Sequence, residues 1–485
     1  MSTNEQIGIQ SNTVSRRSML QQLGGGLGLV GLAGVLANEM KQGSGASYAA
    51  DLASTISRQR AGKLNPLAAK PPHFPAKAKH IIHLFMNGGP SQVDTFDPKP
   101  ALAKYHGKKP PSSDLKTERQ TGTLMQSPFK FHRGGKCGLE VSENYPEVAK
   151  LMDDICVIRS MHTNIPNHEP SLLMMNSGNI QPIRPSLGSW LGYGLGTENE
   201  NLPGYVVLCP GKPVVGPQLW SNSFLPGVYQ GCHIQNLRPK QVIEYLTNSY
   251  LQRKTQREQL DLIQQLNKQH QQNHLGDDQL DARIQSLEMA FRMQTEAQEA
   301  FDIQRESVRV RESYGKGYFS EACLVARRLV ERGVRTVQIY YGNGQPWDDH
   351  SNIAQGHRQK GLESDVAIAA LLRDLKARGL LQDTLVIWGG EFGRTPSSEG
   401  STGRDHNNHG FTMWLSGGGV RGGMAYGATD EFGFAAVDKK VHVHDLHATI
   451  LHLMGLNHEK LTYRYSGRDF RLTDVFGTIV KDIIA

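Results

Sequence analysis

The chain has 485 residues, of which 38% are hydrophobic and 20% are charged, a composition that suits a soluble globular protein with a sizeable core. Its 53 Lys and Arg against 46 Asp and Glu give a net charge of +7, but the excess is spread along the chain without a basic block or a nucleic-acid motif. We therefore expect no nucleic-acid partner, although a mildly attractive field for anionic substrates remains.

The N-terminus reads as a targeting segment. Arg16 and Arg17 precede a Gly-rich apolar run at residues 24–37, which is typical of a Tat export signal. The run is short and Gly-diluted for a membrane span, so we expect membrane contact only through an uncleaved signal. We assign residues 1–49 to the signal and the start of a linker, and predict a periplasmic or extracytoplasmic protein. The alternative is a disordered basic N-terminus.

Residues 50–77 are rich in Ala, Lys and Pro and are predicted to form the rest of the linker. A buried strand follows at residues 81–86, with further short apolar runs at residues 155–158, 205–208, 336–340, 384–388 and 412–415. Amphipathic helices are predicted at residues 321–332, 362–378 and 444–454, each closed by a Gly. Strands alternating with helices predict an α/β domain at residues 78–485, with a parallel sheet covered on both faces.

One segment interrupts this alternation. Residues 236–315 are rich in Gln, Arg, Glu and Leu, and Ile284, Leu287 and Phe291 fall at helical spacing. We predict an inserted pair of long helices with a solvated polar face. The alternative is a surface for a partner protein or for oligomerisation.

The two most informative clusters each follow an apolar run. Glu391 comes just after residues 384–388, and a loop containing Asp405, His406 and His409 follows. Asp348 and His350 come after residues 336–341. Ligands of open α/β sheets bind at the carboxyl ends of the strands, so these side chains predict a divalent-metal site there. Imidazoles favour Zn, Mn or Fe over the all-oxygen cage that Ca prefers and over Mg.

Two further loops carry candidate residues. After the first strand, glycines allow close approach of a ligand, and four polar side chains can face it: Asn87, Ser91, Asp94 and Asp97. The alternative is a plain turn capped by Asp. His168, Glu169 and Ser171 stand at a predicted helix N-terminus, which can attract an anion or hold a nucleophile. A plain helix cap is the alternative there.

Several motifs together resemble an exported bacterial family known as domain of unknown function 1501. They are Gly88-Gly89-Pro90-Ser91 with residues 94–100, and residues 185–190, 224–231, 326–334, 348–352 and 390–396. The family is regarded as a sulfatase-like branch of the alkaline phosphatase superfamily. The resemblance implies an alkaline-phosphatase-like three-layer sandwich, with a mostly parallel central sheet, helices on both faces and a metal site on its edge loops.

The superfamily pattern can be carried over only in part. Glu391 and Phe392 fall where an Asp-His pair of metal ligands is usual, and Phe392 cannot coordinate. His409 falls at the position of a downstream metal histidine. His168 stands where sulfatases have their nucleophile, and no Cys-x-Pro-x-Arg motif occurs in the chain, which excludes formylglycine chemistry.

The leading hypothesis is a metal-dependent hydrolase that acts on sulfate or phosphate esters without formylglycine. Its expected metal ligands are Asp348, His350, Glu391 and His409. His168 would be a further ligand or the general base, Ser171 or a metal-bound water the nucleophile, and Arg394 the anion-binding group. Additional candidates are Asn87, Ser91, Asp94, Asp97, Glu169, Asp405 and His406.

Two other roles stay open on the sequence alone. A non-catalytic protein on the same fold would bind anionic glycans or a protein partner, and a structural ion would only hold loops together. The distinguishing feature is whether the Asp, His and Glu side chains at the strand ends converge. The expected partner is an anionic small-molecule or glycan ester, and an oligomer is compatible with the helical insertion.

Overall fold

The computed structural model describes residues 66–110, 117, 119–237, 242, 250–273 and 278–485. The predicted signal at residues 1–49 and most of the linker lie outside the described residues. Residues from 80 onwards alternate strands with helices, as the apolar runs predict.

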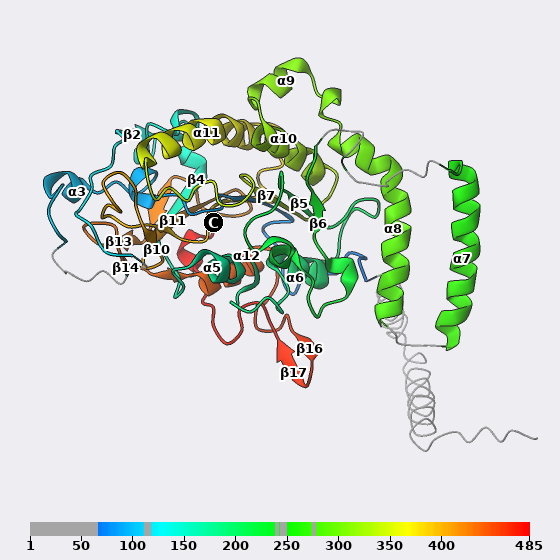
Figure 1. The fold of residues 1–485 in the computed structure, drawn as a ribbon. Helices are drawn as coiled ribbons and strands as arrows, with labels where there is room; N and C mark the ends of the chain where they lie inside the picture. Colours follow the sequence, from blue (N-terminus) through cyan, green and yellow to red (C-terminus); the bar gives the residue numbers. More distant parts are fainter. Residues whose placement is uncertain (1–65, 111–116, 118, 238–241, 243–249, 274–277) are drawn as a thin grey trace, which may run out of the picture. The chain divides into compact units, whose positions relative to one another are not determined.

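A nine-stranded sheet forms the centre of this α/β fold (Figure 1). In spatial order its strands are β12 (Met424–Tyr426), β4 (Ile155–His162), β11 (Phe411–Ser416), β8 (Thr384–Gly389), β1 (His80–Phe85), β7 (Thr336–Tyr340), β5 (Tyr205–Leu208) and β6 (Cys232–Ile234), with β15 (Val441–His442) also paired to β4. All pairings are parallel except those of β11 with β4 and β8. The predicted mostly parallel sheet is confirmed.

Strand β11 runs the other way because of how it is connected. Between β8 and β11 the chain forms only a small hairpin of β9 (Gly393–Arg394) and β10 (His406–Asn407), with no helix. A parallel return would need a long crossover, usually a helix, so β11 comes back antiparallel beside β8.

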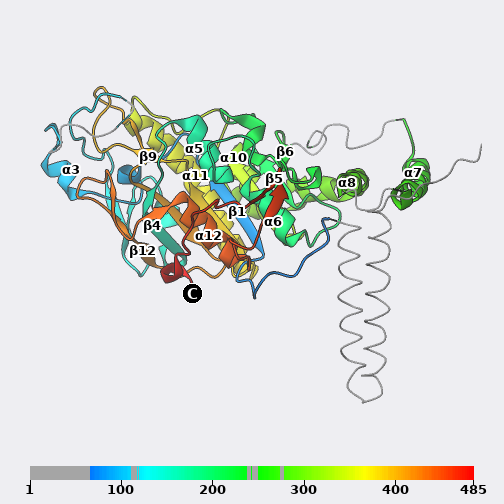
Figure 2. The ribbon, with the colours of Figure 1, turned by 90° about the horizontal axis from the view of Figure 1, so that it is seen from below.

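Helices cover both faces of the sheet, which gives three layers (Figures 1 and 2). Ile82 and Leu84 of β1 share a core with α10 (Tyr318–Glu331) and α11 (Ile353–Ala377). Ile81 and Phe85 point to the opposite core. Because successive strand residues face opposite sides, an all-apolar strand such as β1 feeds both cores.

The opposite core is covered by α5 (His168–Ser177), α6 (Leu187–Leu195) and α12 (Val443–Leu453). The remaining elements are short: α3 (Pro100–Lys104), α4 (Pro146–Ala149), α9 (Val308–Ser313), β2 (Phe131–Gly134), β3 (Leu139–Ser142), β13 (Ala428–Thr429), β14 (Ala436–Asp438), β16 (Tyr463–Tyr465) and β17 (Arg468–Phe470). Single 3-10 turns lie at Gln92–Asp94, Met152–Asp154, Gly216–Trp220, Gly227–Tyr229, Ile303–Arg305 and Lys481–Ile483.

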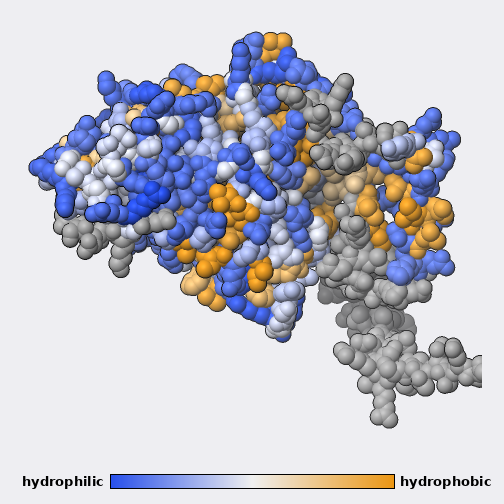
Figure 3. Space-filling view, in the orientation of Figure 1, coloured by the Kyte–Doolittle hydropathy of each residue, from blue (hydrophilic) through white to orange (hydrophobic). Residues whose placement is uncertain are grey.

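Two long helices occupy the segment where the sequence predicts them, α7 (Arg253–Asn273) and α8 (Asp278–Phe301). Phe291 of α8 is buried, whereas Leu287 is 47% exposed. On α7, Leu262, Ile263 and Leu266 are also about half exposed, and Figure 3 shows hydrophobic side chains on the surface of this helical segment. No helix among the described residues is both long and apolar enough to span a bilayer.

The loops after neighbouring strands are tied together at the carboxyl edge of the sheet. The amide of Asn87 donates its Nδ2 hydrogens to the carbonyls of Gly342, at 2.9 Å, and Gly344, at 2.5 Å. The Trp347 N–H donates to the Asn87 carbonyl at 3.1 Å. These bonds hold the loop after β7 against the loop after β1, at the edge where α/β folds place their sites.

Candidate metal centre

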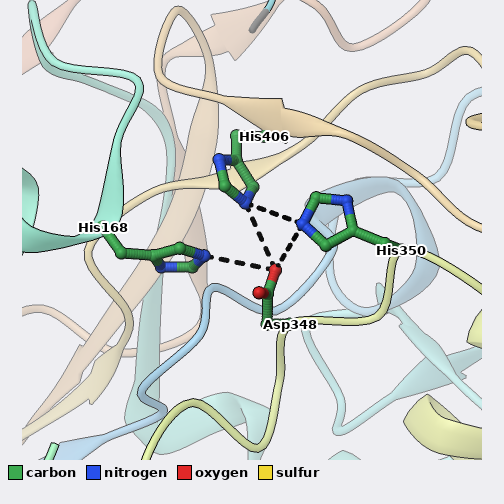
Figure 4. Close-up of side chains that lie close together, drawn as sticks. All are labelled: His168, Asp348, His350 and His406. Atoms are coloured by element: carbon green, nitrogen blue, oxygen red, sulfur yellow. Dashed lines mark hydrogen bonds and ion pairs between the residues drawn. The ribbon is translucent and has the colours of Figure 1, made fainter. Parts of the chain in front are cut away.

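Three imidazoles and one carboxylate meet at this edge (Figure 4). His168 is the first residue of α5, and His406 begins β10. Asp348 and His350 lie in the loop between β7 and α11. The four side chains therefore come from three separate segments, all of which follow strands of the central sheet.

The meeting point is Oδ1 of Asp348. His350 Nε2 lies 2.9 Å from it, and the Nε2 atoms of His168 and His406 lie 3.2 Å from it. The Nε2 atoms of His350 and His406 are 3.1 Å apart. His168 Nε2 is buried and its alignment with Asp348 is too poor for a hydrogen bond.

The other nitrogen of each ring faces an acceptor. His168 Nδ1 lies 2.7 Å from Oε1 of Glu391, and His406 Nδ1 lies 3.1 Å from the Pro166 carbonyl. His350 Nδ1 contacts the carboxylate of Glu399. A carboxylate or carbonyl oxygen can only accept, so each Nδ1 carries a hydrogen, and each ring in its neutral form turns the lone pair at Nε2 toward Asp348.

Three lone pairs and a carboxylate oxygen aimed at one point repel one another unless a cation or protons lie between them. In proteins, imidazoles that bind a metal characteristically donate their second N–H to a carboxylate or a carbonyl, as all three do here. Ligand bonds of about 2.0–2.2 Å give ligand–ligand edges of about 2.8–3.6 Å in octahedral to tetrahedral sites. The distances of 2.9–3.2 Å fit that range, so these residues fit a divalent metal ion.

The ionisation of the cluster is consistent with a cation site. Burial opposes ionisation of Asp348, but the three imidazoles and Arg394 outweigh it and hold the pKa of this carboxyl well below its usual range. Contact with Asp348 raises the pKa of His350. Burial alone would lower the pKa of His168, but Asp348 and Glu391 raise it. Without a metal, His168 and His350 therefore hold protons more tightly, which a metal ion would replace, whereas burial lowers the pKa of His406.

Part of the cluster is open to solvent. The side chains of Asp348 and His350 are 22% and 20% exposed, whereas those of His168 and His406 are 10% and 5% exposed. Phe392 packs against the rings of both His168 and His406, with centroids 4.7 Å apart in each case. Solvent thus reaches the cluster at Asp348 and His350, while Phe392 covers the rings of His168 and His406.

Residues 78–484 match the family model described as protein of unknown function, DUF1501. The chain belongs to this family. The resemblance inferred from its motifs is confirmed, and no curated protein matches the sequence.

Several solved structures resemble this member of the DUF1501 family. A lipoteichoic acid synthase from Listeria monocytogenes is 8% identical, with 85% of this chain and 80% of that chain covered and a TM-score of 0.36. A sulfatase from Pseudoalteromonas sp. is 12% identical, with coverages of 79% and 68% and a TM-score of 0.33. The alkaline phosphatase of the Antarctic bacterium TAB5 is 10% identical, with coverages of 79% and 99% and a TM-score of 0.31. At these TM-scores no activity is transferred from them.

The expected ligand Glu391 lies behind the cluster. It is fully buried, and besides His168 it accepts the Gly88 N–H at 2.9 Å. Its carboxylate therefore orients an imidazole through the far side of the ring. His409, the other expected ligand from this loop, lies beside Phe434, with ring centroids 5.1 Å apart, and is not among the four converging residues. His406 takes the place expected for His409.

Arg394, expected to bind an anion, is also fully buried. Its guanidinium donates to Oδ1 of Asp348 at 2.7 Å, to the Gly89 carbonyl at 2.9 Å and to the Gly88 carbonyl. The structure therefore places Arg394 as the anchor of Asp348 and of the loop after β1. Ser171, expected as a nucleophile, is buried and donates its hydroxyl to the Ile165 carbonyl at 2.8 Å.

The remaining candidates lie around the cluster and not in it. Ser91 donates to Asp94, and Asp94 forms a fully buried ion pair with Arg404 at 2.7 Å. Asp97 accepts a hydrogen bond from Thr429. Glu169 is exposed at the start of α5. Asn87 binds the loop after β7, as described above, so this group shapes the loops.

Sequence reasoning missed Glu399 and singled out Asp405 only as an additional candidate. Ligand atoms of His350, Glu399 and Asp405 lie within 4.8 Å of one another, at the rim of the cluster. Asp405 accepts the His406 N–H at 2.8 Å and the Arg119 N–H at 2.9 Å. No spacing in the sequence marks Glu399, because its role depends on the irregular loop between β9 and β10.

Proposed function

We propose that this chain is an exported, divalent-metal-dependent hydrolase of sulfate or phosphate esters. Its proposed metal ligands are His168, Asp348, His350 and His406, with Zn, Mn or Fe as the ion. The observation that carries the proposal is the convergence of three Nε2 atoms on Asp348 while every Nδ1 faces an acceptor. Three nitrogen donors disfavour Ca and Mg.

A bound divalent ion would polarise the ester and lower the pKa of a water molecule. The chain's own residues would keep the ligands in place: Glu391 and Glu399 hold the rings of His168 and His350, and Arg394 holds Asp348. Because Ser171 donates its hydroxyl to a backbone carbonyl inside the helix layer, we propose water and not a side chain as the nucleophile. This also agrees with a histidine at the position of the sulfatase nucleophile.

The test is metal content together with an ester screen. Mature protein from about residue 50 is purified, reloaded with Zn, Mn or Fe, and compared with an Asp348→Ala/His406→Ala variant and with His409→Ala as the matched control. We expect one ion per chain in the wild type and in His409→Ala, none in the double variant, and hydrolysis of 4-nitrophenyl sulfate or phosphate esters that follows the metal. Folded wild type that takes up no metal would refute the proposal and favour a binding role.

We include export in the proposed function because Arg16 and Arg17 match the twin arginines of a Tat signal. An Arg16→Lys/Arg17→Lys variant should remain in the cytoplasm if the Tat route carries the protein, whereas the wild type should appear outside the cytoplasm. Export of the variant at the wild-type level would contradict this route.

A further inference from the structure

A second surface with chemically distinctive side chains begins at the opposite end of α5 from the candidate metal centre. It consists of the loop at residues 178–185, the hairpin of β16 and β17, which projects from the body of the domain in Figure 1, and the segment at residues 471–477. We call this surface the Arg184 face. The ten residues of α5 span about 15 Å, so the face starts a full helix length away from His168.

Arg184 is half-buried on this face and has no acceptor there. Its Nε is buried without a hydrogen-bond partner, and its guanidinium forms no hydrogen bond or ion pair within the part of the chain that the structure describes. The guanidinium carbon lies 4.3 Å from the ring centre of Phe470. The carboxylate of Asp474 accepts from Arg468 instead. An arginine that keeps its charge and its N–H donors without an acceptor is suited to bind an oxyanion.

The cavity beside Arg184 is too small for a whole ligand. It is lined by Arg184 and Arg471, by the polar side chains of Ser177 and Asn179, and by Trp190 and Phe224. Its volume is about 10 Å³, which is enough for one water-sized group. One oxygen of an anion therefore fits beside the guanidinium, while the rest of the ligand stays at the surface.

The apolar side chains around Arg184 are unusually exposed. Ile183 is 65% exposed and Val475 is 70% exposed, and Ile180, Tyr465 and Phe476 are also exposed. Figure 3 shows hydrophobic residues gathered on this side of the molecule, next to the hairpin. Single exposed apolar residues are common, but a group of them around a charged side chain marks an interaction surface.

The chemistry of the face favours a lipid bilayer over a glycan. A sugar stacks on a free aromatic face, but the ring of Phe470 is contacted by both Arg184 and Arg468, and the ring of Tyr465 stacks on Phe224. The most exposed side chains are aliphatic, and these suit the boundary between lipid head groups and acyl chains. An arginine beside them suits the phosphate of an anionic lipid.

We propose that the Arg184 face docks on an anionic phospholipid bilayer. Arg184 binds a lipid phosphate, and Ile183 and Val475 enter the interface beside it. This contact is separate from the one that the sequence predicts through an uncleaved signal, and it does not depend on the proposed hydrolase function.

Cosedimentation with lipid vesicles tests the proposal. The protein used begins at about residue 50, because every strand and helix of the domain lies beyond residue 79 and the apolar run at residues 24–37 would bind lipid by itself. Its partition coefficient is measured with phosphatidylglycerol vesicles and with phosphatidylcholine vesicles. We expect at least about fivefold stronger binding to the anionic vesicles, as one arginine at the head groups would give.

Two substitutions separate the contributions of charge and apolar contact. Arg184→Gln should weaken binding to phosphatidylglycerol vesicles about fivefold, because it removes the cation. Ile183→Ser/Val475→Ser should weaken it at least about tenfold, because it removes the two most exposed side chains of the face. Both of these positions are at the surface, and circular dichroism shows whether each variant is folded.

The matched controls lie on the opposite face of the sheet. Arg358 of α11 is also an exposed arginine close to an aromatic ring, that of Phe129, so Arg358→Gln makes the same change of charge elsewhere. Val308 of α9 and Leu362 of α11 are exposed, so Val308→Ser/Leu362→Ser removes a similar apolar surface. Neither control should change the partition coefficient.

Each outcome decides the proposal. Binding to phosphatidylglycerol vesicles that falls in both variants of the Arg184 face and persists in both controls supports it. Folded wild type that does not sediment with either kind of vesicle overturns it. An equal loss in Arg184→Gln and Arg358→Gln also overturns it, because net charge alone would then explain binding. Retention on immobilised dextran sulfate without vesicle binding would assign the face to a sulfated polysaccharide instead.

Discussion

Replacement of Glu391 is the sharpest test of which residues bind the ion and which position them. Glu391 is fully buried, and its Oε1 lies 2.7 Å from His168 Nδ1 and 2.9 Å from the Gly88 nitrogen. Glu391→Gln keeps the shape and one oxygen at the same place, so both hydrogen bonds can persist. What it removes is the negative charge behind the His168 ring.

The expected loss follows from the change in the hydrogen bond. A bond to a charged group is worth about 1.5–3 kcal/mol and a neutral one about 1 kcal/mol. This difference of about 1 kcal/mol, together with the lower basicity of His168 Nε2, predicts that the metal binds about tenfold more weakly. Loss of a group that hydrogen-bonds a metal-binding imidazole typically weakens metal binding by about 10–100-fold, so the expected effect lies at the lower end of that range. Glu391→Ala removes both bonds and should approach about 100-fold.

The assay is competition for Zn against a chromogenic chelator at pH 7.5. The dissociation constant is measured for wild type, Glu391→Gln and Glu391→Ala, with circular dichroism to show that each variant is folded. His350→Ala serves as the reference for loss of a ligand, and it should weaken binding more than either substitution of Glu391.

Two results would contradict this reasoning. If Glu391→Gln abolished binding to the same extent as His350→Ala, Glu391 would be a ligand, as the sequence predicts, and not a positioning residue. If neither Gln nor Ala changed the dissociation constant, the contact between Glu391 and His168 would have no part in holding the ion.

Three further predictions test the frame around the site. Gly88→Ala should destabilise the protein by about 1–3 kcal/mol and weaken metal binding, because Gly88 has φ +109° and a Cβ would lie 2.6 Å from the Asp348 nitrogen. Chemical denaturation measures the first effect and the chelator assay the second. Wild-type values in both assays would contradict the prediction. Arg394→Lys should lower the free energy of unfolding by about 3 kcal/mol, because a single ammonium group cannot replace the several guanidinium N–H groups that bond Asp348 and the backbone carbonyls. A change smaller than the error of urea denaturation would refute this prediction. Burial lowers the pKa of His83 and of His447 to about 3. Below pH ~6.5 the unfolded chain therefore binds protons at these histidines that the folded chain excludes. The free energy of unfolding is thus retained above pH ~6.5 and falls as the pH drops toward ~4. His83→Asn should remove about 2 kcal/mol of the fall in unfolding free energy between pH 7.5 and 5, measured by urea denaturation. An unchanged fall would count against a neutral buried His83.

Much of the fold could be predicted because its strands are short apolar runs. All six residues of β1 are buried, and the predicted run at residues 81–86 marks this strand to within one residue. The prediction that polar side chains gather at the strand ends places Asp348 and His350 at the cluster, since β1, β7 and β8 are parallel neighbours. Local pattern and the geometry of parallel sheets suffice for this part.

The choice between His406 and His409 could not be made from local pattern. It depends on the register of the hairpin of β9 and β10, in which His406 pairs with Arg394 and Asn407 with Gly393. These strands have two residues each and no hydrophobic alternation to mark them. Three residues later the chain has turned away, and His409 lies beside Phe434.

The same hairpin explains why the site is built around a buried arginine. Arg394 bonds backbone carbonyls of Gly88 and Gly89 after β1, of Trp347 after β7 and of Arg404 in its own loop, together with Asp348. One guanidinium thus holds three loops together. It also supplies hydrogen-bond donors to their buried backbone carbonyls, which would otherwise have none from this side chain. Its positive charge adds to the effect of the three imidazoles, which together hold the pKa of Asp348 well below its usual range. The protein itself therefore sets the geometry of the four candidate ligands, and such preorganisation is what gives a metal site its affinity and its choice of ion.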